Sequence, residues 1–562
     1  MNKLEIKQAI SEKINQIYRD KADAVMAELE PVIQKFEQLS FPKHEVIGEN
    51  NVYLITYGDS IQSAGKAPLL ALKETLDEVA RETISDVHLL PMFPYTSDDG
   101  FSVTDYYQIN PSLGDWSDIH HLGQDYRLMF DFVANHMSKS SDWFKRFLVE
   151  DPEFREAFIK ENPNFDVSNV VRPRTSPLFH TYEGKNGSVS AWSTFSEDQV
   201  DVNIQDGKML ARLTDVILTY AREGASSIRL DAIGFLWKKS GTSSIHLTET
   251  HELIQLWRIL LEYFAPNTQI ITETNVPHEE NISYFGNKRN EAQMVYQFPL
   301  PPLVLHAFTK NSSEILSGWA KNIDRVSSTS TYFNFLASHD GIGMRPTEGI
   351  LPEEERGFLV EKVLANGGKV SYKSNLDGSE TVYELNINYS EALRNEGEDD
   401  EQTTQKMIAA HHILLSMVGV PAIYYHSLFG SKNDFKGVNE SGINRRINRE
   451  KLDKEVLLNE LETNHYRKTI FNGISKLIKT RKNYEQFSPY ASQSVLDYGA
   501  KIFALKRNLG DGQKSILAFT NVSNETVSIE GVSGFDIINE ALVTNTLSLN
   551  AYGFAWIEVE EK

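Results

Sequence analysis

Hydrophobic residues follow two alternating patterns along most of this chain. Short apolar runs, typical of buried strands, are separated by longer stretches in which apolar residues recur every three or four positions, as on one face of a helix. Leu210–Glu223 and His251–Phe264 are two of the helical stretches. Such alternation predicts parallel strands joined by crossover helices.

Eight apolar runs qualify as strands, which is the number that closes a (β/α)8 barrel. The candidates are Asn51–Tyr57, Val87–Pro91, Arg127–Ala134, the runs ending at Asp231 and Glu273, Met294–Gln297, Phe333–Ala337 and Pro421–Tyr425. We therefore predict an α/β fold in which residues 49–134, 206–340 and 401–482 form a TIM barrel.

The remaining segments are predicted to lie outside the barrel. Residues 1–48 carry apolar residues at helical spacing on a charged background, which predicts an N-terminal helical extension. Two gaps between strands, 135–205 and 341–400, are too long for ordinary loops, so we expect each to fold as an inserted subdomain. In residues 483–562 short β-prone runs replace the helical pattern and predict a small C-terminal β-sandwich.

Charge and composition narrow the range of functions. The 562 residues include 56 Lys plus Arg against 78 Asp plus Glu, and the net charge of −22 opposes binding to nucleic acid or anionic membranes. There is no cysteine, which excludes disulfides and thiolate metal sites. The N-terminus lacks the apolar stretch of a secretory signal, and no run of about 18 apolar residues occurs. We expect a cytoplasmic monomer or homodimer that acts on small molecules.

Three of the predicted strands end in acidic residues. Because positions i and i+2 of a strand point to the same face, Arg229 and Asp231 project together. Glu273 ends the next apolar run, and Asp340 ends a later one. The active site of a TIM barrel lies where its strands end, so this fold can bring the three acids together. Glycosyl transfer with retention of configuration requires one carboxylate as nucleophile and a second carboxyl group as proton donor.

At these positions the sequence resembles the α-amylase clan, glycoside hydrolase family thirteen. The segments that carry this resemblance are Asp131–His136, Arg229–Gly234, Glu273 and His339–Asp340. Further segments are similar to the sucrose phosphorylase branch of the clan, namely Ser97–Phe101, Val171–Arg174, Tyr296–His306, His339–Gly343 and Asn444–Arg449. The likeness extends from about residue 51 to residue 480.

The resemblance implies a role for each acid. Asp231 would attack the anomeric carbon to form a β-glucosyl ester, and Arg229 would orient it and stabilise its charge. Glu273 would act as general acid and then as base. Asp340 would stabilise the oxocarbenium-like transition state. A non-catalytic sugar-binding protein on the same barrel is a competing interpretation that the loss of any acid would have favoured, and all three are present.

The resemblance also implies a set of residues that hold the glucose unit. They comprise two histidines that bond its hydroxyls, an acid and an arginine at the far edge of the ring, two aromatic walls and a lining amide. In that order they are His136 and His339, Asp98 and Arg445, Phe101 and Phe195, and Gln199. As alternatives, the histidines and phenylalanines are core residues and the arginine belongs to a surface ion pair. The sucrose phosphorylase branch generally lacks the calcium that many amylases bind at the position of Asn135, so we expect no metal and no cofactor.

The acceptor side of the site decides between phosphorolysis and hydrolysis, because any nucleophile can end the glucosyl ester. Phosphate requires fixed cationic donors, and the sequence Arg172–Arg174 offers two arginines around a stiffening proline. The resemblance implies that Arg174 contacts phosphate; the alternative is an ion pair with a surface carboxylate. We therefore predict a retaining glycoside phosphorylase with inorganic phosphate as co-substrate. An α-glucosidase or transglucosidase is the competing interpretation.

Three features are more similar to glucosylglycerate phosphorylases than to plain sucrose phosphorylases: the N-terminal extension, the segment Glu273–His278 and the loop Ser338–Leu351. Arg345 in that loop is a candidate to bind a carboxylate acceptor such as D-glycerate, or alternatively to brace the loop against Glu348. We expect 2-O-α-D-glucosylglycerate as the glucoside. Sucrose, sucrose 6′-phosphate and glucosylglycerol remain alternative substrates.

Overall fold

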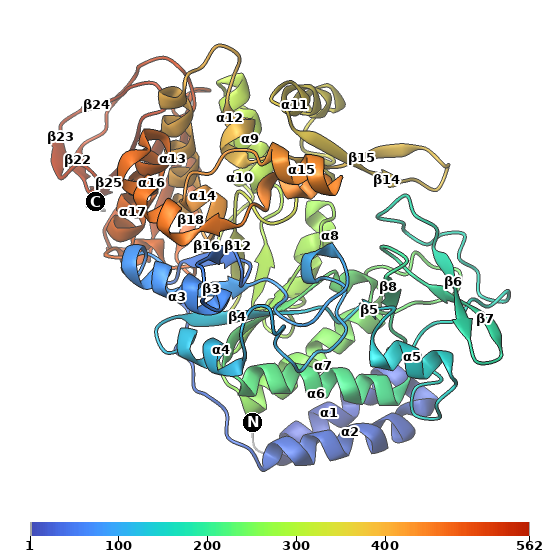
Figure 1. The fold of residues 1–562 in the computed structure, drawn as a ribbon. Coiled ribbons are helices and arrows are strands. Elements are labelled where there is room, and N and C mark those ends of the chain that lie inside the picture. Colours follow the sequence, from blue (N-terminus) through green and yellow to red (C-terminus); the bar gives the residue numbers. More distant parts are fainter. Residues whose placement is uncertain (1–2, 561–562) are drawn as a thin grey trace.

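The computed structural model describes residues 3–560, and a closed barrel of eight parallel strands lies at its centre (Figure 1). In order around the barrel, the strands are β1 (Tyr53–Thr56), β16 (Val420–Tyr424), β12 (Thr331–Asn334), β11 (Met294–Tyr296), β10 (Gln269–Thr272), β9 (Ala225–Leu230), β4 (Arg127–Phe132) and β3 (Asp86–Leu89). The predicted TIM barrel is confirmed, with one strand at each of the eight predicted runs.

The barrel strands are buried on both faces, as expected of parallel strands covered by helices. β9 is buried along its whole length although it contains two serines and an arginine. Ser227 Oγ lies 2.7 Å from the hydroxyl of Tyr53, and Ser226 Oγ donates to the carbonyl of Leu128 at 3.0 Å. The hydroxyl groups of both serines thus have hydrogen-bond partners inside the barrel. Arg229 lies near the carboxyl end of the strand.

Helices cover the outside of the barrel (Figure 1). The two helical stretches singled out in the sequence form α6 (Gly207–Arg222) and α7 (Thr248–Phe264). Other covering helices are α3 (Pro68–Val79), α4 (Trp116–Leu122), α9 (Leu300–Lys310), α13 (Asp400–Ser416) and α17 (His465–Arg481). No helix between residues 3 and 560 is both long and apolar enough to cross a membrane.

The N-terminal helices α1 (Lys3–Tyr18) and α2 (Ala22–Glu37) form a hairpin that packs on α7 and α6 (Figure 1). The apolar spacing seen in the sequence buries one face of each helix against the barrel's outer layer. At the end of α1, the hydroxyl of Tyr18 donates to the carbonyl of Ile204 at 2.7 Å, and its ring lies 5.6 Å from that of Trp237. The hairpin therefore supports the segment that follows Asp231.

Two long excursions leave the C-terminal ends of the strands. Residues 135–205 contain α5 (Asp142–Leu148) and the strand pairs β5 (His136–Ser138) with β8 (Gln199–Asp201) and β6 (Phe179–Gly184) with β7 (Gly187–Trp192). Residues 341–400 contain α11 (Glu353–Ala365) and a sheet in the order β13 (Ile342–Gly343), β15 (Glu380–Asn386), β14 (Lys369–Ser374). Figure 1 shows the β6–β7 and β14–β15 hairpins on the same side of the molecule.

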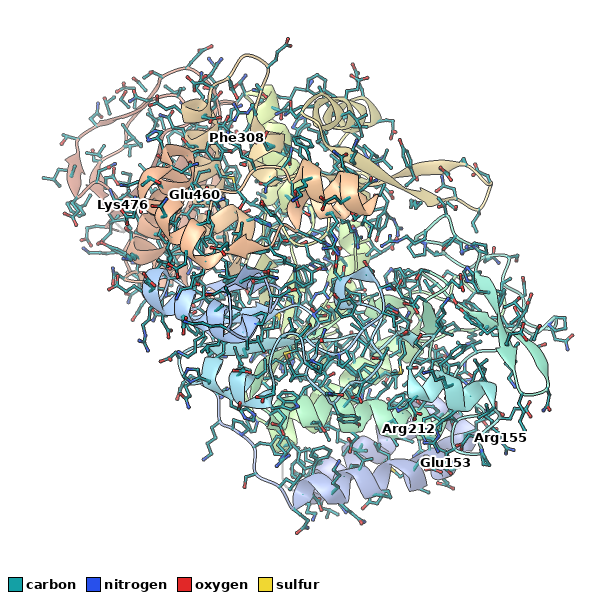
Figure 2. All side chains as sticks on the ribbon, viewed as in Figure 1. Glu153, Arg155, Arg212, Phe308, Glu460 and Lys476 are labelled. Carbon is teal, nitrogen blue, oxygen red and sulfur yellow. The ribbon has the colours of Figure 1, made fainter. Side chains whose placement is uncertain are left out.

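Both the first excursion and the C-terminal domain are attached to barrel helices by specific contacts. Glu153 of the excursion forms an ion pair with Arg212 of α6 at 3.4 Å (Figure 2). Phe308 of α9, also labelled in Figure 2, has its ring 6.1 Å from that of Tyr552 in the C-terminal domain.

The predicted C-terminal β domain is present. Its six-stranded sheet has the order β18 (Ser492–Leu496), β19 (Ile502–Asn508), β20 (Ser515–Asn521), β25 (Phe554–Val559), β22 (Gly534–Asp536), β23 (Ala541–Val543). A smaller sheet pairs β21 (Val527–Glu530) with β24 (Thr546–Leu549). Ile529 and Leu547 of the smaller sheet share a hydrophobic core with Phe519 of the larger one.

Two fully buried arginines join this domain to the barrel, and each donates to three backbone carbonyl groups. Arg481 bonds the carbonyls of Leu415, Glu49 and Phe487, and Arg507 bonds those of Ser492, Ser416 and Ser488. A buried carbonyl that loses its partner carries a desolvation cost. The junction therefore depends on these two guanidinium groups.

We predict that Arg481→Met lowers the stability of the folded protein by about 3 kcal/mol or more, because three buried carbonyls lose their donor at once. Thermal and urea unfolding midpoints measure the change. Arg325→Met, at an exposed position, is the matched control and is expected to change stability by less than about 0.5 kcal/mol. Equal midpoints for the two variants would contradict the prediction.

Candidate active site

Two of the predicted acids lie directly at the carboxyl ends of barrel strands. Asp231 follows the last residue of β9, and Glu273 follows the last residue of β10. This rim is where TIM barrels place their active sites. The backbone turns sharply after Asp231, since Ala232 adopts a left-handed conformation with φ 46°. Its N–H donates to Glu273 Oε2 at 3.0 Å, so the turn ties the two acids together.

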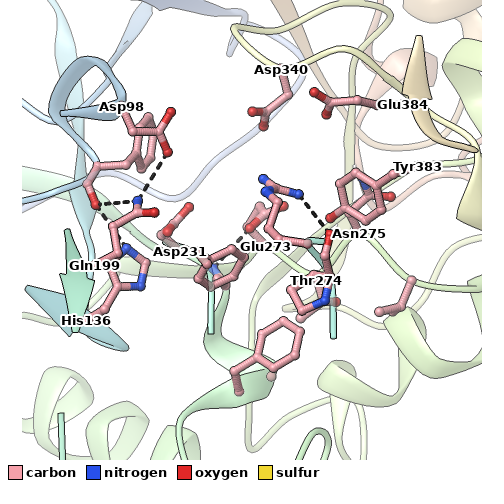
Figure 3. Close-up of a pocket in the computed structure, with 18 of the residues that line it drawn as sticks. Asp98, His136, Gln199, Asp231, Glu273, Thr274, Asn275, Asp340, Tyr383 and Glu384 are labelled. Carbon is pink, nitrogen blue, oxygen red and sulfur yellow. Dashed lines mark hydrogen bonds between the residues drawn. The ribbon is translucent and has the colours of Figure 1, made fainter. Parts of the chain in front are cut away.

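The third acid is placed differently from the prediction. The sequence predicted a strand at Phe333–Ala337 whose run ends in Asp340, but β12 ends at Asn334 and Asp340 lies beyond it in a loop. Phe333 and Asn334, the last residues of β12, pair with Val420 and Pro421 of β16. Asp340 nevertheless reaches the same cavity as the other two acids (Figure 3).

This cavity is lined by every predicted catalytic, glucose-binding and acceptor-binding residue except Arg229 and Arg172. The predicted residues that line it are Asp98, Phe101, His136, Arg174, Phe195, Gln199, Asp231, Glu273, His339, Asp340, Arg345 and Arg445. Residues from five different barrel loops and both excursions thus converge on one space. Figure 3 shows the carboxyl groups of Asp98, Asp231, Glu273 and Asp340 around it.

Arg229 lies beneath the cavity, with 2% of its surface exposed. Its Nη1 donates to Asp231 Oδ1 at 2.8 Å and to Asp131 Oδ1 at 2.6 Å, and its Nε donates to the hydroxyl of Tyr296 at 3.0 Å. The second oxygen of Asp131 lies 2.8 Å from His88 Nε2. Two of the three guanidinium nitrogens thus form hydrogen bonds, and the bond from Nη1 holds Asp231 in a fixed orientation.

The protonation of Asp231 and Glu273 follows from these contacts. Burial raises the pKa of both carboxyl groups, and the positive charge of Arg229 opposes the rise in each. Arg229 bonds Asp231 directly, whereas its Nη2 lies 3.8 Å from Glu273 Oε2. The direct bond to Arg229 therefore stabilises the ionised form of Asp231 more than that of Glu273.

Asp340 has the opposite shift. Burial alone would raise the pKa of its carboxyl group, but the guanidinium groups of Arg445 and Arg449 lower it overall. Arg445 Nη1 lies 2.9 Å from Asp340 Oδ1. Asp340 is consequently ionised and offers a fixed negative charge beside the space above Asp231.

The side chains predicted to bind glucose form the opposite wall. Gln199 Nε2 donates to Asp98 Oδ2 at 3.2 Å and to the carbonyl of Phe101 at 3.1 Å (Figure 3). His136 Nε2 bonds the same carbonyl at 2.9 Å, and burial lowers the pKa of this imidazole, which keeps it neutral. The ring of Phe101 stacks on that of His339 at 4.8 Å. Polar edges and aromatic faces alternate here, as sugar hydroxyls and CH faces require.

Glu384 is a cavity residue that the sequence analysis missed. It lies on β15 in the second excursion and bonds Arg445 through both oxygens, at 2.7 Å to Nε and 3.0 Å to Nη2. The predicted partner Asp98 is 3.9 Å from Arg445 Nη1. The signal that could have found Glu384 is an acidic residue within a strand, and in the structure the strand segment Tyr383–Asn386 that contains it is buried.

The acceptor side of the cavity carries two arginines from different excursions. The guanidinium of Arg174 lies 5.0 Å from the ring centre of Tyr383 and 5.5 Å from that of Phe195. Arg345 begins the short helix η5 (Arg345–Thr347), and its Nε is buried without a hydrogen-bond partner. In the part of the chain that the structure describes, neither guanidinium forms an ion pair within 4.0 Å, so the surface ion pair and the brace to Glu348 are not formed.

At Asn135, the position where many amylases bind calcium, the side-chain oxygens of Asn135 and Asp201 contact the ammonium group of Lys238. Lys238 Nζ donates to Asn135 Oδ1 at 2.8 Å and lies 2.6 Å from Asp201 Oδ2, with all three residues buried. Over residues 3–560 no group of three histidine or acidic side chains is arranged to hold a metal ion.

Comparison with known proteins places this geometry in a family. The model of the α-amylase catalytic domain matches residues 66–344. A glucosylglycerate phosphorylase of Spirochaeta thermophila is 46% identical over 85% of this chain and 81% of its own length. A glucosylglycerate phosphorylase of Escherichia coli is 41% identical over 98% of this chain and 100% of its own length.

A solved structure agrees with these sequence relatives. The crystal structure of sucrose 6F-phosphate phosphorylase from Thermoanaerobacter thermosaccharolyticum has a TM-score of 0.74 and 25% identity, and it covers 89% of this chain and 97% of the other. Identity above 40% across nearly the whole of the E. coli relative leaves no doubt about kinship. The chain belongs to the α-amylase family, in the group that holds the glucosylglycerate and sucrose phosphorylases.

Proposed function

We propose that this protein is a retaining glycoside phosphorylase. It cleaves 2-O-α-D-glucosylglycerate with inorganic phosphate and yields α-D-glucose 1-phosphate and D-glycerate. The observation that carries the proposal is the presence, in one cavity, of three carboxyl groups suited to glycosyl transfer and two arginines that have no carboxylate within 4.0 Å among residues 3–560. The names of the relatives at 41–46% identity support the choice of glucoside.

The first displacement forms a covalent intermediate. Ionised Asp231 attacks the anomeric carbon from the β face of the ring, opposite the bridging oxygen, while Glu273 gives its proton to that oxygen, and glycerate leaves with a free 2-hydroxyl. Positive charge develops on the ring, and the fixed carboxylate of Asp340 stabilises it. The product is a β-glucosyl ester of Asp231.

The second displacement reverses the geometry. A phosphate oxygen attacks the same carbon from the α face, Glu273 in its carboxylate form accepts the proton that phosphate loses, and Asp231 leaves as a carboxylate. Two inversions give net retention, so the product is the α-anomer. Phosphate is a co-substrate, and the mechanism uses no cofactor.

The charges around the cavity favour anionic acceptors on one side only. The glucose side holds Asp98, Asp340 and Glu384, and the arginine there, Arg445, is neutralised by its ion pairs. The acceptor side holds Arg174 and Arg345, and within the described part of the chain no carboxylate lies within 4.0 Å of either guanidinium to neutralise its charge. An unpaired half-buried guanidinium is costly unless an anion binds it. This asymmetry supports phosphate and a carboxylate-bearing acceptor over water or a neutral sugar.

We predict that the enzyme releases glucose 1-phosphate from glucosylglycerate only when phosphate is present. The direct test incubates the enzyme with the glucoside, with and without phosphate, and assays glucose 1-phosphate and free glucose separately. Free glucose as the main product, at a rate independent of phosphate, would identify an α-glucosidase instead. Asp231→Asn is the control without the nucleophile and should form neither product.

The pH dependence of cleavage should report the raised pKa of Glu273. The general acid is active only while protonated, so kcat/KM for glucosylglycerate falls as pH rises through that pKa. Glu273→Gln should lower kcat/KM by about 10²–10⁴-fold. Fluoride needs no proton to leave, so release of fluoride from α-glucosyl fluoride should be far less affected by the variant or by high pH. An equal loss with both donors would show that Glu273 is not the proton donor.

Arg345→Ala should weaken binding of anionic acceptors selectively. In the synthetic direction with glucose 1-phosphate, we expect the KM for D-glycerate to rise about tenfold or more, as for loss of a charge-assisted hydrogen bond, while the KM for glycerol changes little. Initial rates across a range of each acceptor measure both constants. Equal increases for the two acceptors would remove Arg345 as the carboxylate ligand.

A further inference from the structure

Besides Arg345, a second side chain on the acceptor side of the cavity has a buried polar atom without a hydrogen-bond partner among residues 3–560. Asn275 lies two residues after Glu273, in the loop between β10 and α8 (His278–Ile282), and lines the cavity (Figure 3). Its Oδ1 is buried and forms no hydrogen bond within the described residues. A buried amide oxygen left unpaired costs free energy, so its retention calls for a ligand that satisfies it.

The position of Asn275 is determined by the loop that carries Arg345. A Cβ atom added at Gly343 would lie 2.7 Å from Asn275 Oδ1 and 3.1 Å from Nδ2, so the amide packs directly on the glycine. Gly343 itself is held in a ladder opposite Glu384, and the N–H of Met344 donates to the carbonyl of Tyr383 at 2.9 Å. Any residue larger than glycine at this position would displace the amide.

Three chemically different groups therefore surround the space where an acceptor must lie. Glu273 supplies the proton to the reacting oxygen, Arg345 supplies a cation with an unpartnered Nε, and Asn275 supplies a neutral amide. They come from two loops, after β10 and after β12, that contact each other through Gly343. A small acceptor with one hydroxyl in reaction, one anionic group and one further hydroxyl matches this set.

We propose that Asn275 is a specificity-determining residue that binds the free hydroxymethyl group of the acceptor, while Arg345 binds its carboxylate. The inference rests on the proposed function and deepens it. The substituents of C2 in D-glycerate that are larger than hydrogen are the reacting oxygen, the carboxylate and the hydroxymethyl group. One protein group for each of the three defines the configuration at this carbon, so the site distinguishes D- from L-glycerate.

The test compares three acceptors with glucose 1-phosphate as donor. D-Lactate is D-glycerate without the hydroxyl on C3, and glycerol lacks the carboxylate. Wild type should prefer D-glycerate to D-lactate by about tenfold or more in kcat/KM, because a site built to bond a hydroxyl rejects an analogue that lacks it. Asn275→Ala should bring this ratio close to one while D-glycerate remains preferred to glycerol.

Arg345→Ala is the matched variant and should show the reverse. The preference for D-glycerate over glycerol should collapse, while D-glycerate remains preferred to D-lactate. Each ratio compares two acceptors on one enzyme preparation, so the fraction of folded enzyme cancels. Gly343→Ala, which displaces the amide without removing it, should change the lactate ratio in the same direction as Asn275→Ala, and both variants should lose discrimination against L-glycerate.

Failure of the inference and failure of the proposed function give different results. If wild type transfers no glucose from glucose 1-phosphate to D-glycerate, the proposed function is wrong. If wild type makes the glucoside but Asn275→Ala keeps the wild-type ratio of D-glycerate to D-lactate, the function stands and the assignment of Asn275 is wrong. An equal loss of the lactate and glycerol ratios in Asn275→Ala would also overturn the assignment, since it would indicate general disorder of the acceptor side.

Discussion

The buried guanidinium of Arg229 is the interaction on which the reaction centre depends. It lies beneath the cavity, between Asp131, Asp231 and Tyr296. An unpaired cation or an unpaired carboxylate buried there would be strongly destabilised. Because it bonds Asp231 and lies farther from Glu273, it also separates the two otherwise similar acids, stabilising the ionised form of Asp231 more than that of Glu273. The proposed chemistry needs that separation before any substrate arrives.

The residues that line the cavity come from two parts of the molecule, the rim of the barrel and the two excursions. The rim supplies Asp231 and Glu273 on rigid strand ends, which suits groups that must stay aligned with the anomeric carbon. The excursions supply Arg174, Arg345 and Glu384 to the wall of the cavity. In the proposed function, residues at the strand ends carry out the glycosyl transfer, and residues of the excursions select the acceptor. A single scaffold can thus serve phosphorylases with different acceptors.

The barrel could be predicted from the sequence alone because the patterns that indicate its strands and helices are local. The apolar runs and the i, i+2 spacing of Arg229 and Asp231 depend only on neighbouring residues. Asp340 was assigned to the correct cavity but to the end of a strand, since β12 ends at Asn334 and the extent of a strand depends on its pairing with segments far away in the chain, here Val420 and Pro421. Glu384 and Asn275 were missed because their importance lies in contacts between distant segments. Neither the ion pair of Glu384 with Arg445 nor the packing of Asn275 on Gly343 leaves a periodic trace in the sequence.

The most direct measurement is the site at which glucose becomes attached to the protein. Glu273→Gln lacks the base that activates an acceptor, so treatment with α-glucosyl fluoride in the absence of phosphate should let the covalent intermediate accumulate. Intact-protein mass spectrometry should then find one added glucosyl unit, and peptide mapping should locate it on Asp231. A glucosyl unit on another residue, or none while fluoride is released, would contradict the account.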